Sequence, residues 1–279
     1  MTTLGLVAAA TERFAAAGVD SPRFDAEELA AHVLGVRRAG IVLAPAMTRD
    51  QEAAYGALVE RRAARVPLQH LVGSTGFRRL ELLVGPGVFV PRPETESVVQ
   101  WALEALRGIP APLVADLCTG SGTIALALAD ELPAGATVHA VERDPGAFAW
   151  LQRNITATGL AVHAHLGDAG DALAELAGTL DLVASNPPYV AEHERAHVDP
   201  EVADHDPPIA LFAGDDGLDV VRVVERAAWR LLRPGGVLVV EHSDRQGRSA
   251  PALLGGRWLE VADHRDLAGR DRFVTARRP

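Results

Sequence analysis

From about residue 93 to the C-terminus, short apolar runs that suit buried strands alternate with segments that suit helices. Strands are expected at 113–117, 137–142, 162–166, 181–185 and 236–241, and near 258–262 and 272–276. Helices are expected at 95–107, 122–131, 146–158, 171–176 and 217–232. Strands that alternate with helices form a mostly parallel sheet that is covered on both faces. The sequence therefore predicts a doubly wound α/β domain.

The first part of the chain has a different pattern and is expected to form a small helical domain over residues 1–73. Ser21-Pro22 is typical of a helix start, and Thr48-Arg49-Asp50-Gln51 fits a capping box. The arginines that follow on the same helix are expected to form a solvated face, with a docking patch as the less favoured alternative: Arg61, Arg62 and Arg65. Strand-like runs at 77–84 and 88–90 flank Gly85-Pro86-Gly87, which predicts a β-hairpin. This hairpin, within residues 74–91, is expected to connect the helical domain to the α/β domain at 92–279.

Composition limits the classes of partner and location. The net charge is −10, and all 27 basic residues are arginines. An acidic chain of this kind is a poor binder of nucleic-acid backbone, so no direct nucleic-acid partner is expected. No apolar run reaches the roughly 18 residues of a membrane span, and the N-terminus lacks the basic stretch of a signal peptide. With Cys118 as its only cysteine, the chain can form no internal disulfide, which favours a cytoplasmic location. A monomer with no membrane partner is also expected.

Each of three successive predicted strands ends at or just before an acidic residue, and a glycine-rich turn follows the first of these strands. The first strand ends in Asp116-Leu117-Cys118-Thr119-Gly120-Ser121-Gly122, where glycines allow a tight turn before a helix N-terminus. Glu142 ends the next strand at the spacing used to bind ribose hydroxyls. Asp168-Ala169 follows the third strand. The chain has no lysine and therefore no P-loop, so a nucleoside without phosphate, such as S-adenosylmethionine, suits this site best.

Asn186-Pro187-Pro188-Tyr189 follows the fourth predicted strand and offers a site for a planar NH2 group. The Asn186 side-chain oxygen and the Pro187 carbonyl can each accept one N–H of such a group. The prolines restrict the backbone, and Tyr189 offers a ring face for a flat amide or base. If the fourth strand lies beside the first, the tetrapeptide faces the reactive end of the cofactor.

These motifs resemble those of class I S-adenosylmethionine-dependent methyltransferases, and further segments are similar to the glutamine methyltransferases of peptide chain release factors, the HemK/PrmC family. The similar segments span nearly the whole chain: Asp25-Ala26-Glu27-Glu28-Leu29, Pro67-Leu68-Gln69-His70-Leu71-Val72-Gly73, Phe77, Val90-Pro91-Arg92-Pro93-Glu94-Thr95-Glu96, Asp206-Pro207-Pro208 and Asp216-Gly217-Leu218. The resemblance implies a Rossmann-like, seven-stranded sheet after a helical substrate-recognition domain. It also implies methylation of the side-chain amide nitrogen of the glutamine in the release factor's Gly-Gly-Gln motif, with S-adenosylhomocysteine as product.

The resemblance also implies roles for particular residues. The cofactor would be bound by Asp116, Cys118, Thr119, Gly120, Ser121, Gly122, Glu142, Asp168, Ala169 and Asn186, and the substrate glutamine by Asn186, Pro187, Pro188 and Tyr189. Asn186, Pro187 and Tyr189 are the candidate catalytic residues. Cys118 replaces a glycine of the family pattern, and Ala169 stands where a bulky aromatic is common. Asp244-Arg245-Gln246-Gly247 also departs from the family's form and has no interpretation from sequence.

Several alternatives remain at this stage. Arg92 and Glu94 are expected either to line the substrate site or to form a helix cap with a salt bridge. A ribosomal-protein glutamine methyltransferase, a nucleic-acid amino methyltransferase and an inactive binding module compete with the release-factor function. His193-Glu194-Arg195-Ala196-His197 fits a zinc-protease motif. It follows two prolines and has little apolar sequence around it, so a charged loop is the favoured interpretation and no metal is expected.

Overall fold

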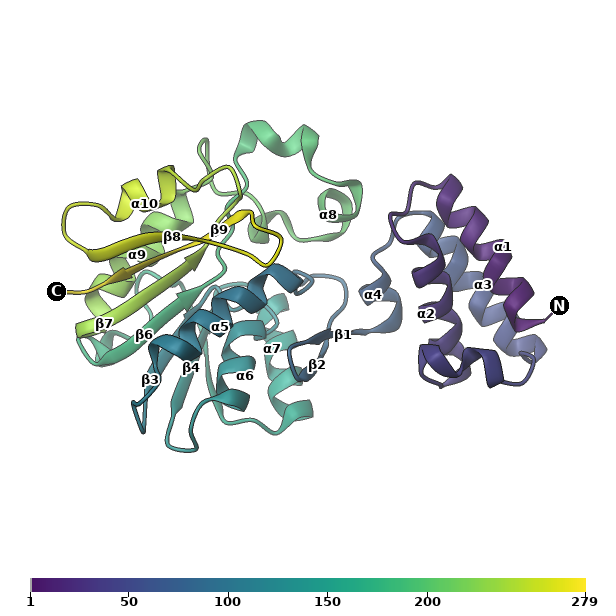
Figure 1. The fold of residues 1–279 in the computed structure, drawn as a ribbon, viewed down its shortest axis with the longest axis horizontal. Helices are drawn as coiled ribbons and strands as arrows, with labels where there is room; N and C mark the ends of the chain where they lie inside the picture. The colour runs from purple at the N-terminus through teal and green to yellow at the C-terminus, as the bar shows by residue number, and fades with distance from the viewer. Residues whose placement is uncertain (1) are drawn as a thin grey trace. The chain divides into compact units, whose positions relative to one another are not determined.

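The computed structural model describes residues 2–279, which form two compact units. The first unit comprises residues 2–74 together with Asp199–His205, and the second comprises Thr75–Val198 and Asp206–Pro279. Figure 1 shows helices in the first unit and a sheet between helices in the second. The sequence did not predict that a segment near residue 200 belongs to the helical unit.

The first unit is built from helices around one apolar core. Its elements are α1 (Thr3–Ala16), α2 (Pro22–Leu34), the 3-10 helix η1 (Arg38–Leu43), α3 (Arg49–Ala63), α4 (Leu68–Val72) and α8 (Pro200–His205). Phe14 and Leu29 are fully buried in the core. The capping box before α3 is confirmed, because the Thr48 hydroxyl accepts from the Gln51 backbone and the Gln51 side chain accepts from the Thr48 backbone. The apolar stripes of α1 and α2 and this cap explain why the segment is helical.

The expectation of a solvated arginine face on α3 was wrong for Arg62. Its side chain is only 4% exposed, and Nε donates to Asp25 at 2.6 Å. Nη2 donates to Glu201 of α8 at 2.8 Å. Burial raises the pKa of Asp25, whereas its contact with Arg62 opposes that shift. A buried charge needs such partners, so Arg62 joins α2, α3 and α8 within the helical unit.

The predicted hairpin exists but is shifted along the chain. β1 (Ser74–Phe77) pairs with β2 (Leu80–Leu83), and the turn lies at Arg78-Arg79 instead of at Gly85-Pro86-Gly87. Arg78 has a left-handed backbone with φ of 51°, and its guanidinium pairs with Glu131. This tertiary ion pair holds a turn that lacks the usual glycine. Gly85 instead packs against the ring of Trp150.

The second unit contains a seven-stranded sheet of order β5-β4-β3-β6-β7-β9-β8. Its strands are β3 (Leu113–Leu117), β4 (Thr137–Glu142), β5 (Val162–Leu166), β6 (Leu180–Ser185), β7 (Leu232–Glu241), β8 (Leu259–Arg265) and β9 (Asp271–Arg277). All neighbouring pairs from β5 to β7 are parallel, and β9 pairs antiparallel with β7 and β8. The predicted doubly wound α/β fold is confirmed.

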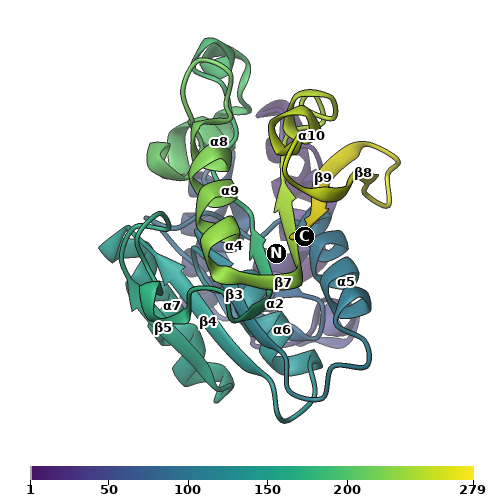
Figure 2. The ribbon, with the colours of Figure 1, turned by 90° about the vertical axis from the view of Figure 1, so that its left-hand side faces the viewer.

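Helices cover both faces of this sheet (Figure 2). One face packs against α5 (Glu96–Ala105), α6 (Thr123–Glu131) and α7 (Pro145–Thr158), and the other against α9 (Asp219–Leu231) and α10 (Ser249–Leu254). The predicted helix at 171–176 is only the 3-10 turn η3 (Ala174–Leu176). β6 lies beside β3, as predicted, so the carboxyl ends of β3, β4 and β6 meet at one edge of the sheet.

Candidate functional site

The turn after β3 is held by the carboxyl group of Asp116. Its Oδ2 accepts from the Thr119 hydroxyl and from the backbone N–H of Ala125 at 3.0 Å, which ties the turn to the first turn of α6. Burial raises the pKa of Asp116 to about 7. Oδ1 is buried and has no hydrogen-bond partner among residues 2–279. The site thus has an acceptor that a positively charged or N–H-bearing ligand could satisfy.

Left-handed backbone at three residues gives the turn its tight shape. Cys118, Gly120 and Gly122 have φ values of 61°, 58° and 92°. An added Cβ at Gly122 would lie 2.7 Å from Leu151 and 2.9 Å from Leu126, so this position requires glycine. Cys118 takes the same conformation without being glycine, which makes it the strained member of the turn. Burial raises the pKa of its thiol to about 12, so the thiol stays neutral near pH 7.

Glu142, at the end of β4, supports the same turn from the neighbouring strand. Its carboxylate accepts from the backbone N–H of Gly120 at 2.9 Å and from that of Asp144 at 2.7 Å. Burial raises the pKa of this carboxyl, and these backbone contacts oppose the shift. Because a carboxylate has about four acceptor positions, Glu142 keeps capacity to accept from a hydroxyl group of a ligand.

A cavity adjoins these acidic strand ends. Its lining combines apolar side chains with the turn after β5: Cys118, Val141, Arg143, Gly167, Asp168, Ala169, Val220 and Val223. Asp168 is exposed and accepts from the backbone of Gly170 at 2.9 Å. Ala169 is buried against α9, so it leaves space where a larger ring would stand. The carboxylate acceptors of Glu142 and Asp168 and the apolar walls of the cavity fit an adenosine group.

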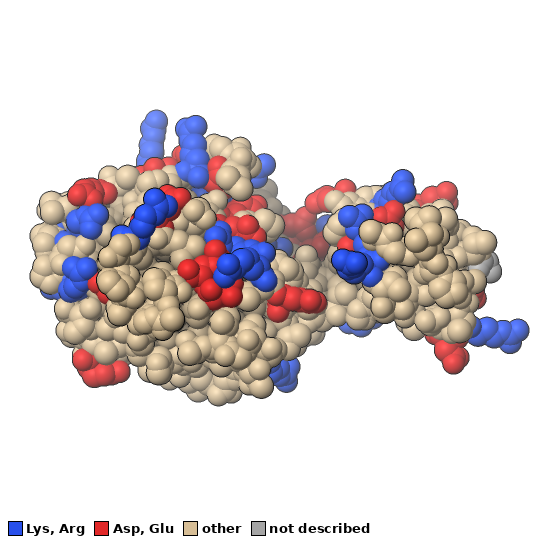
Figure 3. All heavy atoms as spheres, turned by 60° about the horizontal axis from the view of Figure 1, so that its bottom comes forward, with Lys and Arg blue, Asp and Glu red and all other residues tan. Residues whose placement is uncertain are grey.

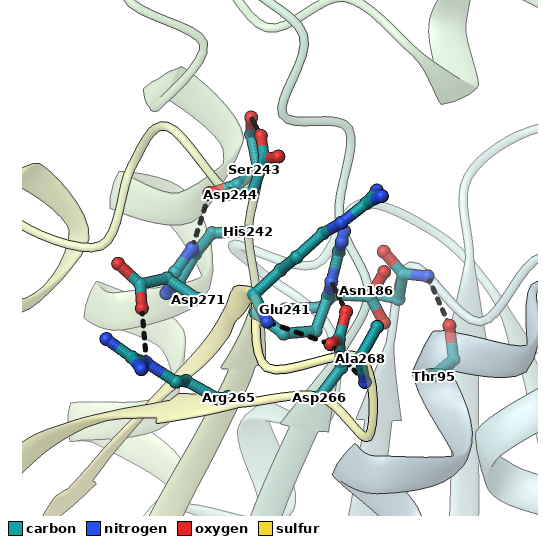
Figure 4. A network of polar contacts seen from close by, with 12 residues as sticks. Thr95, Asn186, Glu241, His242, Ser243, Asp244, Arg265, Asp266, Ala268 and Asp271 are labelled. Carbon is teal, nitrogen blue, oxygen red and sulfur yellow. Dashed lines mark hydrogen bonds and ion pairs between the residues drawn. The ribbon is translucent and has the colours of Figure 1, made fainter.

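The Asn186 amide lies after β6 in a defined orientation. Its Nδ2 donates to the Thr95 hydroxyl at 3.2 Å (Figure 4). Thr95 is the last residue of the 3-10 helix η2 (Pro93–Thr95), immediately before α5. Before the tetrapeptide, Ser185 donates its hydroxyl to the Leu117 carbonyl at 2.6 Å and joins the ends of β6 and β3. Asn186 thus lies beside the glycine-rich turn, as the sequence predicted.

Tyr189, the last residue of the tetrapeptide, contacts Glu241. The Tyr189 hydroxyl donates to Glu241 Oε1 at 3.3 Å. Glu241 is the last residue of β7 and is almost fully buried. Burial and the negative charge of Glu241 raise the pKa of Tyr189. The ring is therefore fixed at its hydroxyl end, and Tyr189 stays protonated.

Gln246, in the segment that had no interpretation from sequence, holds the backbone after the tetrapeptide. Its Nε2 donates to the carbonyls of Tyr189 and Asp216, each at 3.1 Å, while its Oε1 accepts from the Ser243 backbone at 2.9 Å. Gly217 lies against the Tyr189 carbonyl so closely that no side chain would fit. Sequence reasoning missed Thr95, Glu241 and Gln246. For Thr95 the available signal was its place inside the Arg92–Glu96 segment.

Arg92 forms a salt bridge: its Nη2 donates to the carboxylate of Asp206 at 2.8 Å. Asp206 is buried, and Arg92 also lies over the ring of Phe89. Arg92 precedes η2 but makes no side-chain cap there. Glu94 is half-buried on η2. Burial is the main cause of the raised pKa of Glu241, and the negative charge of Glu94 adds to it.

The His193–His197 motif has the wrong local structure for a zinc protease. It lies in the 3-10 helix η4 (Glu192–His197), where residues four apart do not share a face. Glu194 pairs with Arg245 at 2.6 Å, and both histidines are exposed. Within residues 2–279, no group of three or more His, Cys, Asp or Glu side chains is arranged to hold a metal. No helix in the same range is long and apolar enough to cross a membrane.

Comparisons with known proteins agree with this geometry. A family profile described as the PrmC N-terminal domain matches residues 6–73, and one described as the methyltransferase small domain matches residues 80–205. A release factor glutamine methyltransferase of Streptomyces coelicolor is 54% identical over 99% of this chain and 98% of its own length. Its counterpart from Mycolicibacterium smegmatis is 49% identical over 98% of this chain and 96% of its own length. The chain belongs to the release factor glutamine methyltransferase family.

Membership of this family makes the chain an S-adenosylmethionine-dependent methyltransferase. Solved structures agree on the fold of the second unit. A methyltransferase of Pyrococcus furiosus has a TM-score of 0.53 at 16% identity and covers 78% of this chain and 98% of its own. A 16S rRNA guanine methyltransferase of Thermus thermophilus has a TM-score of 0.52 at 24% identity, over 74% of this chain and 50% of its own. Both likenesses concern the fold alone.

Proposed function

We propose that this protein methylates the side-chain amide nitrogen of the glutamine in the Gly-Gly-Gln motif of peptide chain release factors. The observation that carries the proposal is the orientation of the Asn186 amide. Because Nδ2 is bound to Thr95, the Oδ1 acceptor points away from Thr95 and is left for a ligand. The family relatives supply the class of substrate, since their names specify release factors.

The cofactor assignments follow from the turn after β3 and the two neighbouring strand ends. Glu142 would accept from the ribose hydroxyls, and the cavity beside Asp168 and Ala169 would take the adenine. The turn from Cys118 to Gly122, held by Asp116, would bind the amino-acid end at the N-terminus of α6. S-adenosylmethionine supplies an electrophilic methyl group when bound, and S-adenosylhomocysteine is the product.

Asn186 and Pro187 would align the substrate amide. An amide nitrogen is a weak nucleophile because its lone pair is delocalised. If the Asn186 Oδ1 and the Pro187 carbonyl accept both N–H groups, the lone pair points toward the methyl group without prior deprotonation. Alignment of this kind supplies about 7–11 kcal/mol in favourable cases. The same acceptors stabilise positive charge that develops on nitrogen.

The rest of the tetrapeptide and the segment before α5 would shape the substrate site. Pro188 restricts the backbone, and the Tyr189 ring, whose hydroxyl donates to Glu241, would offer a face to the substrate amide. Arg92 would act through its salt bridge with Asp206, which fixes the loop that follows the tetrapeptide. Glu94 would contribute negative charge near the site.

The partner and location follow from the same proposal. We also propose that the chain acts as a monomer in the cytoplasm, where it would meet release factors. On the face in Figure 3, arginines and acidic residues are interspersed without an extended basic patch. That distribution favours a protein substrate over a nucleic-acid backbone.

The test is to incubate the purified protein with purified release factor and isotope-labelled S-adenosylmethionine, and then to locate the label by peptide mass spectrometry. We expect one methyl group on the motif glutamine. A release factor whose motif glutamine is replaced by alanine is the matched control and should stay unlabelled. Parallel reactions with ribosomal proteins and with oligonucleotides test the two competing substrate classes, and label on either in place of release factor would overturn the proposal.

A further inference from the structure

Arg230, near the C-terminal end of α9, binds the loop that follows β5. Its Nη2 donates to the carbonyl of Gly170 at 2.9 Å and to that of Ala172 at 2.8 Å. These carbonyls come shortly after Asp168 and Ala169, which line the cavity beside the acidic strand ends. A single guanidinium group on α9 therefore fixes the backbone of this loop at two points.

Helix α9 also contributes directly to the same cavity. Val220 and Val223 belong to its lining. Arg230 follows Val223 by seven residues, which is about two helical turns, so the two side chains project from the same face of α9. The Gly170 backbone lies against this face, because a Cβ added there would be 3.4 Å from Val223 Cγ1. The loop after β5 and the lining from α9 are therefore in contact, and Arg230 joins them.

Hydrogen bonds inside the loop set its shape but not its distance from α9. The Asp168 side chain accepts from the backbone N–H of Gly170 at 2.9 Å, and the Asp168 carbonyl accepts from that of Ala172 at 3.0 Å. Ala169 contributes only a methyl group to the lining. The width of the cavity at this point therefore depends on where the loop backbone lies, and Arg230 determines that position from α9.

We propose that Arg230 is a positioning residue for the cofactor, which sets the width of the adenosine cavity by holding the loop after β5 against α9. This inference rests on the proposed placement of the adenosine group. Arg230 acts through the backbone of the loop and not through contact with the cofactor. A flat ring gains most from walls at contact distance, because a gap of about 0.5–1 Å already removes a quarter to a half of the dispersion attraction.

The main test uses Arg230→Met, which keeps an unbranched side chain and removes the donors. We expect the calorimetric Kd for S-adenosylhomocysteine to rise about tenfold, because the loop is released from α9 and the contacts across the cavity loosen. Arg230→Lys, which can still donate to a carbonyl, should recover part of the affinity. Arg277→Met is the matched control, since Arg277 also donates to a backbone carbonyl, that of Gly235 on β7, at 2.8 Å. Its Kd should stay within about twofold of the wild-type value.

Hydrogen–deuterium exchange of the ligand-free proteins gives a second readout. Amides in residues 169–173 should exchange several-fold faster in Arg230→Met than in the wild type and in Arg277→Met, because the loop opens more often. The inference is overturned if Arg230→Met keeps the wild-type Kd, if exchange in residues 169–173 is unchanged, or if Arg277→Met weakens binding equally.

The failure of this inference can be told apart from failure of the proposed function. Wild-type protein that binds no S-adenosylhomocysteine would remove the basis of both. Wild-type protein that binds S-adenosylhomocysteine but leaves release factor unmethylated would overturn the proposed substrate alone, because the Kd and exchange measurements do not involve release factor.

Discussion

At the scale of single residues, the proposed function depends on the direction of a few hydrogen bonds. The tetrapeptide motif indicated that Asn186 could accept an N–H, but the motif does not determine which way its amide points. In the structure the amide nitrogen donates to the hydroxyl of Thr95, which lies 91 residues away in the sequence. Contacts of such long sequence separation leave no local pattern, which is why sequence reasoning found the acceptor and missed its support.

Glu241 gives a prediction for stability. Its pKa is raised from 4.5 to about 7 in the folded protein, so its stabilising contribution is present below about pH 4.5 and is lost as the pH rises through about 7. Glu241→Gln removes the buried charge. The variant should be more stable than wild type at about pH 8, by on the order of 1–3 kcal/mol, and similar to wild type at about pH 5.

Urea unfolding at the two pH values measures this difference. Glu104→Gln, at an exposed position on α5, is the matched control and should show no such pH dependence. A variant that is equally destabilised at both pH values would contradict the assignment of a buried, titrating carboxyl.

At the scale of elements, alternating apolar and helical patterns were sufficient to locate the strands of the large sheet. Prediction failed where tertiary contacts determine the local structure. The hairpin turn lies at Arg78-Arg79 because Arg78 is held by Glu131, and Gly85 packs on Trp150 instead of turning the chain. Glycines alone do not reveal whether they serve a turn or a close contact. In the candidate site, the acidic strand ends and the tetrapeptide were recognisable because each follows a strand.

The turn after β3 gives a prediction at this scale. Gly122→Ala adds a methyl group that meets Leu151 and Leu126 in a left-handed backbone position. Overpacking costs about 1–3 kcal/mol, and the left-handed backbone costs about 1–2 kcal/mol more. We expect a loss of stability together with weaker binding of S-adenosylmethionine, because the turn must move.

The matched control for this substitution is Gly159→Ala. Gly159 ends α7 with φ of 69° and has open space around its Cα. Gly159→Ala should lower stability only by the cost of a left-handed backbone at alanine. Calorimetry should show an unchanged affinity for S-adenosylmethionine. Equal effects of the two variants would show that the contacts of Gly122 are not what the turn requires.

At the scale of the whole molecule, the chain returns to its helical unit after entering the second unit. Helix α8 belongs to the helical unit, although it lies between residues 198 and 206. Glu201 accepts from Arg62 at 2.8 Å and forms an ion pair with Arg65 at 2.9 Å, and both contacts hold this segment to the C-terminal end of α3. No periodicity or motif near residue 200 indicates this. The placement of α8 in the helical unit depends on charged side chains that come into contact only after folding.

Glu201→Gln tests this connection. The variant leaves the buried Arg62–Asp25 pair intact and weakens both contacts of α8. We expect residues 199–205 to be cleaved several-fold faster in limited proteolysis, because an exposed, weakly held segment opens more often. Glu192→Gln, which removes a partner of Arg195 on the surface, is the matched control and should be cleaved at the wild-type rate. Unchanged cleavage in Glu201→Gln would contradict the role of this ion cluster.

The central claim is that Asn186 aligns a release-factor glutamine for methyl transfer. The most direct measurement is mass spectrometry of the Gly-Gly-Gln peptide after reaction with wild-type protein and with Asn186→Ala, each checked for folding by its unfolding temperature. We predict one methyl group on the glutamine with the wild type, and a loss of at least about 100-fold in rate with a folded Asn186→Ala. An unmethylated glutamine with the wild type, or near wild-type methylation by the variant, would contradict the account.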